Sequence, residues 1–215
     1  MTIRGLNKGQ RAALLISECQ NNMTNSASAH GPPPTANNVG YYANQRNIIP
    51  KINNLAAEFR ALDLPVIFCT ISALPGFVGF AVNCALAAAV AKSGVLIRNS
   101  WEAAIDDRLR VTDTDIISDR MHSMSPFTGT ELDAILRGLR VDTVVLCGIS
   151  TNIAIPGAAT EAVGLGYSVI LAEDCTAGGT PETHQMQVSM HLPLLATVTD
   201  SASVIDTLKA ARAAA

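Results

Sequence analysis

Charged side chains are scarce in this sequence. They make up 15% of its 215 residues, compared with about 25% in a typical globular protein. The hydrophobic share of 48% excludes an intrinsically disordered chain, which has few apolar residues and a high net charge. The net charge of −3 argues against nucleic acid or an anionic membrane surface as a partner, because both attract basic proteins. A monomer usually carries more charged residues than this. We therefore expect a homo-oligomer, either a dimer or a tetramer.

Motifs for common cofactors and nucleophiles are also missing. No GxGxxG segment follows an apolar run and no GxxxxGK[ST] occurs, so nothing indicates a nucleotide cofactor. No GxSxG occurs, so a nucleophilic serine at a strand-to-helix turn is unsupported. His184 and His191 are two helical turns apart, about 10 Å, which is too far for one metal ion. We therefore expect no cofactor and no metal, and we interpret both histidines as structural.

The cysteines form no recognisable pattern. Five are present, widely spaced and without a CxxC pair, which fits neither a disulfide framework nor a zinc site. Long hydrophobic runs are missing as well, because Phe77–Ala91 contains Asn83 and is shorter than the roughly 20 residues that span a bilayer. The first ten residues include no apolar core of a signal peptide. We expect a cytoplasmic protein in which one cysteine could be a nucleophile.

Short apolar runs alternate with amphipathic helical patterns along the whole chain. Continuous apolar runs are typical of parallel strands that are buried on both faces. The alternation predicts one domain over residues 1–215 with a three-layer α/β/α architecture and a six-stranded parallel sheet. The predicted strands are Ala12–Ser17, Pro65–Ile71, Asp115–Asp119, Thr143–Cys147, Tyr167–Ala172 and Leu194–Thr199, and the predicted helices are Asn47–Leu62, Thr130–Leu139, Thr151–Leu165, Pro181–Leu192 and Ser201–Ala213.

Two segments interrupt this alternation. Asn21–Tyr42 is polar and proline-rich, and we expect a long surface loop there. Residues 73–110 form an insertion, whose alanine-rich part, Phe80–Ala91, is a candidate lid or oligomer surface, or else one more core helix. The single tryptophan, Trp101, either stacks on a ligand or anchors the insertion to the rest of the domain.

Chemically useful side chains follow the predicted strands. Ligand sites in open parallel sheets lie outside the carboxyl ends of the strands, which here would gather Glu18, Arg120 and His122. Glu18 is either a general acid or base or an ordinary carboxylate paired with Arg120. Arg120 could bind an anion or form that structural ion pair. His122 could transfer protons or simply be a hydrogen-bonded loop residue.

Three blocks at these strand ends resemble the isochorismatase-like, or cysteine hydrolase, superfamily. ALLISECQNNM (Ala13–Met23) is similar to the family's ALLxIDxQNDF opening. Ser125–Ala154 is similar to SAFxGTxLxxxLRxxGIxxLxxxGxxTNxC, and Glu161–Gly178 to xAxxxGYxVxxxxDAxxx. The resemblance covers nearly the whole chain apart from the insertion. It implies a six-stranded parallel sheet, a homo-oligomer, and a cis peptide between Ile149 and Ser150.

The resemblance also implies a catalytic set of Asp, Lys and Cys, from which this sequence departs. The Asp position falls on Glu18, the Lys position on Met121 and the Cys position on Ala154. Without a thiolate, no acyl-enzyme route is available at that position. True isochorismatases hydrolyse vinyl ethers without a nucleophilic cysteine, which by similarity makes Glu18 a candidate acid. We expect Glu18, Arg120 and His122 to be catalytic and a further set to bind substrate: Gln20, Trp101, Phe127, Ser150, Asn152 and Ala154.

Three hypotheses for the function follow from these residues. The first is a thiol-independent enzyme that uses Glu18 on a small polar or carboxylated molecule, in vinyl-ether hydrolysis, elimination or cyclisation. The second is a catalytically silent member that binds a ligand or serves as a scaffold. The third, weaker hypothesis is an amidohydrolase in which Cys69, near the end of its strand, is a displaced nucleophile.

Overall fold

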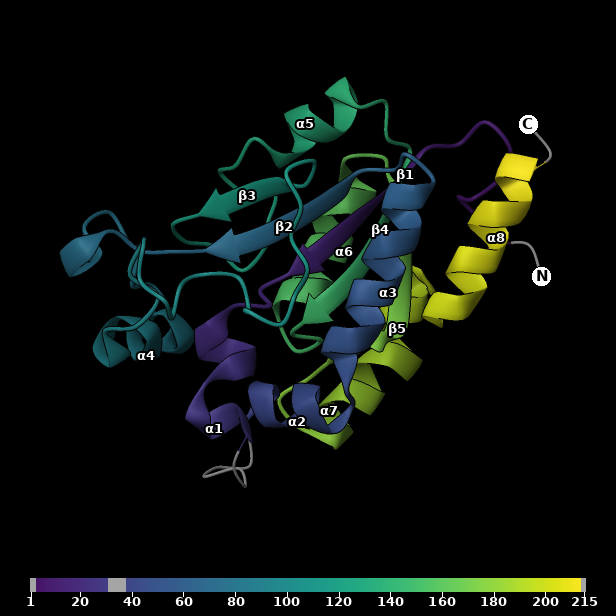
Figure 1. The fold of residues 1–215 in the computed structure, drawn as a ribbon. Coiled ribbons are helices and arrows are strands. Elements are labelled where there is room, and N and C mark those ends of the chain that lie inside the picture. The colour runs from purple at the N-terminus through teal and green to yellow at the C-terminus, as the bar shows by residue number, and fades with distance from the viewer. Residues whose placement is uncertain (1–2, 31–37, 214–215) are drawn as a thin grey trace.

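A six-stranded parallel sheet forms the centre of the molecule, as the sequence predicts (Figure 1). The computed structural model describes residues 3–30 and 38–213. The strand order is β3-β2-β1-β4-β5-β6, so β1 and β4 lie in the middle. The strands are β1 (Ala12–Ser17), β2 (Val66–Ile71), β3 (Ile116–Arg120), β4 (Thr143–Ile149), β5 (Ser168–Ala177) and β6 (Thr197–Thr199).

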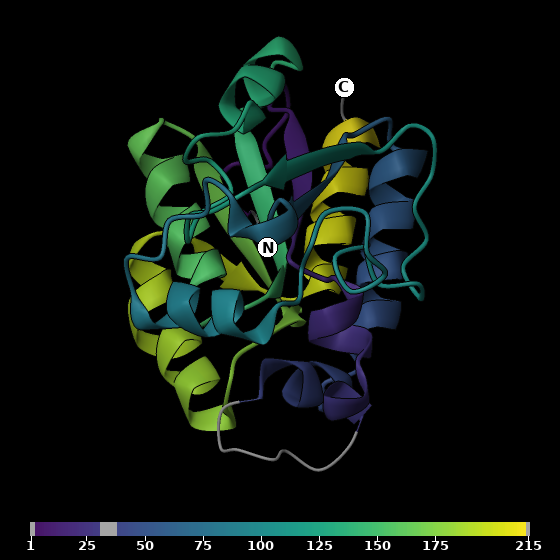
Figure 2. The same cartoon turned by 90° about the vertical axis from the view of Figure 1, so that its left-hand side faces the viewer.

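Helices cover both faces of the sheet and complete the three layers (Figure 2). On one face, α3 (Ile48–Ala61) and α8 (Ser201–Ala213) pack on Leu14, Ile16 and their neighbours. On the other, α5 (Leu132–Gly138) and α6 (Ala154–Gly164) cover residues that include Ala13 and Leu15. Successive β1 side chains alternate between the two cores. This explains why β1 is apolar from Ala12 to Ile16.

The last part of the sheet differs from the sequence prediction. β5 extends to Ala177, because β4 continues to pair with it beyond a register shift between Leu146 and Gly148. Helix α7 spans only Pro181–Met186 and is followed by a π-helical turn (Gln187–His191) and a 3₁₀ turn (Leu192–Leu194). The 3₁₀ turn takes up Leu194, the expected first residue of β6, and the strand begins only at Thr197. Thr180 caps α7, accepting from the Thr183 backbone N–H at 3.1 Å.

The prediction of a surface loop over Asn21–Tyr42 is wrong for its described parts. A π-helical turn (Asn21–Asn25), α1 (Ala27–His30) and α2 (Val39–Gln45) occupy this region, and residues 31–37 lie outside the described part. The backbone of this region is bonded to protein groups: the amide of Asn44, in α2 just after it, donates to the backbone oxygens of Thr24 and Ala29, both at 2.9 Å. The buried Thr24 hydroxyl donates to Asp106 of the insertion at 2.6 Å. Internal hydrogen bonds thus replace the solvent that a loop would need.

The insertion contains a short 3₁₀ turn (Pro75–Phe77) and α4 (Ala85–Ser93), which is not a core helix. Ala87 is the only buried residue of α4. The β2 and β3 arrowheads point to the side of the molecule on which α4 lies (Figure 1). Within residues 3–30 and 38–213, no helix has the length and apolar character needed to cross a membrane.

Candidate active site

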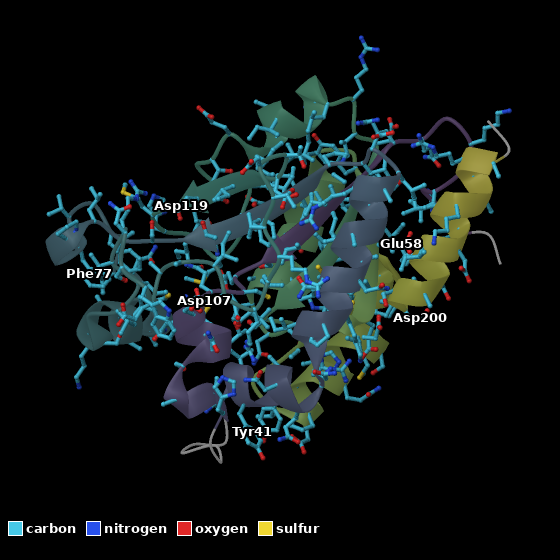
Figure 3. All side chains as sticks on the ribbon, in the orientation of Figure 1. Tyr41, Glu58, Phe77, Asp107, Asp119 and Asp200 are labelled. Atoms are coloured by element: carbon cyan, nitrogen blue, oxygen red, sulfur yellow. The ribbon has the colours of Figure 1, made fainter. Side chains whose placement is uncertain are left out.

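A cavity of about 640 Å³ lies at the carboxyl ends of the central strands. This volume is in the range of small-molecule sites. Glu18 after β1, His122 after β3 and Ser150 after β4 line it together. Figure 3 labels Asp119 on β3 and Phe77 in the insertion, and both lie on the side of the molecule to which the strands β2 and β3 point. The topology therefore brings Glu18 together with two side chains that follow it by more than a hundred residues in the sequence.

Glu18 and Arg120 form an ion pair at the polar end of this cavity. Glu18 has a left-handed backbone with φ of 51°, and its N–H donates to the Cys69 carbonyl at 2.9 Å. Its carboxylate accepts from Nη2 of Arg120, the last residue of β3. Arg120 also donates from Nη1 to the Thr70 carbonyl and from Nε to the Ser123 carbonyl, both at 3.2 Å. The guanidinium is buried and fixes the carboxylate, and it does not line the cavity itself.

Ser150 is positioned by an unusual stretch of backbone. The peptide bond between Ile149 and Ser150 is cis, at the place that the family resemblance implies. Just before it, Gly148 has φ of +92°, and a Cβ there would lie 2.3 Å from the Ser17 carbonyl oxygen. Only glycine permits this close approach between β4 and β1. The chain then turns so that Ser150 lines the same cavity as Glu18.

The other predicted substrate-binding residues lie outside the cavity lining. The Gln20 amide is buried and donates to the carbonyls of Ile71 (2.9 Å) and Ala103 (2.6 Å), which links β2 to the insertion. Asn152 accepts from the Gly179 N–H at 2.6 Å.

The last three predicted substrate-binding residues, Trp101, Phe127 and Ala154, also lie outside the cavity lining. The Trp101 indole donates to Asp107, within the insertion itself, at 2.8 Å and remains half exposed, while the Trp101 carbonyl accepts from the Asn21 amide at 3.0 Å. Phe127 packs in the core beside Tyr167, and Ala154 is buried at the first turn of α6.

Sequence reasoning missed the apolar side of the cavity. Phe80, Leu86, Val90 and Leu96 of the insertion line it, and we call these four residues the insertion wall. Leu86 and Val90 are four residues apart, so they share one face of α4. The signal in the sequence was the alanine-rich segment that we expected to be a lid or an interface.

The buried thiols are poorly suited to nucleophilic chemistry. Burial raises the pKa of Cys69 and of Cys175 to about 12 each, and it also raises the pKa of Cys19 and Cys147. A thiol with such a pKa is protonated at neutral pH, and the thiolate is the reactive form. Cys84 differs, because it is exposed and lines the cavity at the start of α4.

A buried histidine supports the loop that carries Ser150. The His184 ring lies 3.1 Å from the Thr151 hydroxyl through Nδ1 and 2.8 Å from Glu173 Oε1 through Nε2. Arg46 donates to the same Glu173 oxygen at 2.7 Å. His184 is thus structural, as we predicted, and it links the end of β5 to the loop after β4.

We expect this cluster to make the stability of the protein depend on pH in the acidic range. The hydrogen bond from His184, followed by the Arg46 charge, lowers the pKa of Glu173. Its contribution is therefore complete above the ordinary glutamate value of about 4.3 and is lost as the pH falls through the lowered value. Glu173→Gln should cost about 1.5–3 kcal/mol at neutral pH and nothing at the acid end. Urea unfolding of both proteins across this range measures the difference, and a constant difference would contradict the assignment.

Comparison with known proteins identifies the family. Residues 12–203 match the model of the isochorismatase domain. The chain is 31% identical over 166 residues to the isochorismatase family protein YecD of Escherichia coli O157:H7, covering 75% of this chain and 83% of that protein. It is 30% identical over 115 residues to a ureidoacrylate amidohydrolase, RutB, of Agrobacterium fabrum, covering about half of each chain (52% and 50%).

The fold has solved counterparts as well. A cysteine hydrolase from Pseudomonas syringae pv. phaseolicola superposes with a TM-score of 0.79 at 22% identity, covering 98% of both chains. The matched model spans every strand of the sheet and the cavity residues Glu18, His122 and Ser150. This chain therefore belongs to the isochorismatase family.

Proposed function

We propose that this chain is a hydrolase that works without a thiolate and uses Glu18 to transfer protons. The main support for this proposal is the position of the Glu18 carboxylate. It lines the cavity and is paired with the buried guanidinium of Arg120. Two sequence positions support the proposal. Ala154 stands where the family resemblance implies the catalytic cysteine, and Met121 stands where it implies the lysine. Among the described residues that line the cavity, Glu18 is then the strongest acid, and His122 is a second side chain suited to proton transfer.

Vinyl-ether hydrolysis is the reaction that this arrangement fits best. Protonated Glu18 gives its proton to the terminal vinyl carbon, and water adds to the carbon that carries the ether oxygen. The resulting hemiacetal breaks its bond to the leaving alcohol, which yields an alcohol and a carbonyl compound, and the proton released from water restores Glu18. Arg120 stabilises the carboxylate that exists between these two proton transfers. His122, also in the lining, is positioned to carry the water proton.

Amide hydrolysis through a cysteine is the second candidate, because a relative, RutB, is a ureidoacrylate amidohydrolase. Cys69, the nucleophile in our third hypothesis, is buried and outside the lining, so Cys84 is the cysteine that this candidate requires.

Thiol chemistry separates these candidates. We expect the purified protein to hydrolyse a vinyl ether, with acetaldehyde release as the readout, and Cys84→Ala to retain that rate. Iodoacetamide should leave the rate of Cys84→Ala unchanged, since the remaining thiols are buried. Hydrolysis of amides alone, abolished in Cys84→Ala, would replace the proposal with the cysteine mechanism. Ligand binding without turnover of ethers or amides would favour the silent, ligand-binding hypothesis.

A further inference from the structure

The insertion wall gives the cavity an apolar surface that Glu18 chemistry does not require. Phe80, Leu86, Val90 and Leu96 face the strand ends from outside the sheet. Leu86 is 48% exposed, so much of its apolar surface is in contact with water. Covering such surface is favourable, and each methylene of a ligand that leaves water strengthens binding by about fourfold. The insertion wall therefore favours binding of a ligand with an apolar body.

The cavity also lacks a fixed positive charge. Among the described residues that line it, none is a lysine or an arginine, and Glu18 is the only carboxylate. Arg120 is close behind Glu18, but each of its three guanidinium nitrogens already donates to a protein acceptor. A substrate carboxylate in this cavity would lose water without gaining a cation, which is costly. Of the two roles that the sequence allows for Arg120, these contacts favour the ion pair with Glu18.

We infer that the substrate is an uncharged molecule with an aliphatic or aromatic body, which lies on the insertion wall while its reacting group meets Glu18. This inference rests on the proposed function for the position of the reacting group. Most of the polar lining lies on the strand-end side, where Ser123, Thr128 and Ser150 accompany Glu18 and His122, while the insertion adds Asn83 and Cys84 at the start of α4. The ligand is therefore oriented with its polar end toward the sheet and its apolar body toward α4.

A chain-length series tests the inference through binding alone. The probes are ethyl, butyl and hexyl vinyl ether and the vinyl ether of 6-hydroxyhexanoate, each used to displace the uncharged dye Nile red from the wild-type protein. We expect the displacement constant to fall by roughly 250-fold from ethyl to hexyl vinyl ether, which differ by four methylenes. The carboxylated ether should bind roughly tenfold or more weakly than the hexyl ether.

Two matched variants locate the effect. Leu86→Asn removes apolar surface from the insertion wall and should flatten the dependence on chain length. Val163→Asn changes a similarly exposed residue (42%) near the end of α6, outside this cavity, and should leave the dependence unchanged.

The outcomes distinguish this inference from the proposed reaction. A displacement constant that is independent of chain length, or equal binding of the carboxylated ether, overturns the inference. Length-dependent displacement without acetaldehyde release upholds the substrate class and rejects vinyl-ether hydrolysis.

Discussion

Glu18→Gln should lower kcat by about 10²–10⁴-fold while leaving ligand affinity nearly unchanged. The amide keeps the size of the side chain and an oxygen that accepts from Arg120, but it cannot donate and recover the proton that the reaction needs. The cavity shape and the insertion wall are untouched by this change. Steady-state acetaldehyde release and Nile red displacement, measured on the same preparation, separate the two effects.

Glu18→Asp is the informative control for this variant. It keeps an ionisable carboxyl group and has the length that the family opening implies, but it withdraws the carboxyl group from Arg120 and from the cavity by one methylene. We expect an intermediate rate, since positioning and proton transfer are both needed. Full turnover by Glu18→Gln would exclude Glu18 as the proton-transfer group and would leave its ion pair as a purely structural contact.

Arg120→Met should destabilise the fold by about 3 kcal/mol, near the lower end of the range for breaking a buried ion pair. The Arg120 side chain is 2% exposed and that of Glu18 15%, so the unpaired carboxylate remains largely shielded from water. The carbonyls of Thr70 and Ser123 also lose their donor. Urea unfolding at fixed protein concentration measures the change.

A double variant tests the cause of this destabilisation. Combining Arg120→Met with Glu18→Gln removes the unpaired charge, so part of the lost stability should return even though the pair is absent. Additive losses in the double variant would show that packing of the arginine, and not its charge, is the main contribution. Equal stability of Arg120→Met and wild type would show that solvent compensates for the missing charge.

Much of the fold was predictable because the central strands are buried on both faces. β1 coincides with the predicted run Ala12–Ser17, since each of its residues from Ala12 to Ile16 belongs to one of the two cores. The C-terminal strands of the sheet, β5 and β6, were less predictable. β5 extends through Glu173 and Asp174, whose charges argue against a strand, but the Glu173 carboxylate is hydrogen-bonded to His184 and that of Asp174 to Ser201. Tertiary partners of this kind leave no local trace in the sequence.

The candidate active site was likewise predictable only in part. The predicted strand ends were enough to place Glu18, Arg120 and His122 near one another, because parallel strands direct their carboxyl ends to one edge. They did not show that Gln20 turns away from the cavity to bond with Ile71 and Ala103. Nor did they show which face of the insertion meets the strand ends. Both depend on how a long irregular segment folds back, for which periodicity carries no information.

The segment that supplies the insertion wall is separate from the sheet that carries Glu18 and Arg120. Helix α4 has a single buried residue, so its sequence is little constrained by the core. Substrate preference in such an architecture can diverge quickly through changes in one peripheral segment, whereas the reaction itself is inherited with the sheet. Grafting a different insertion onto this chain would then be a direct route to altered selectivity with the same chemistry.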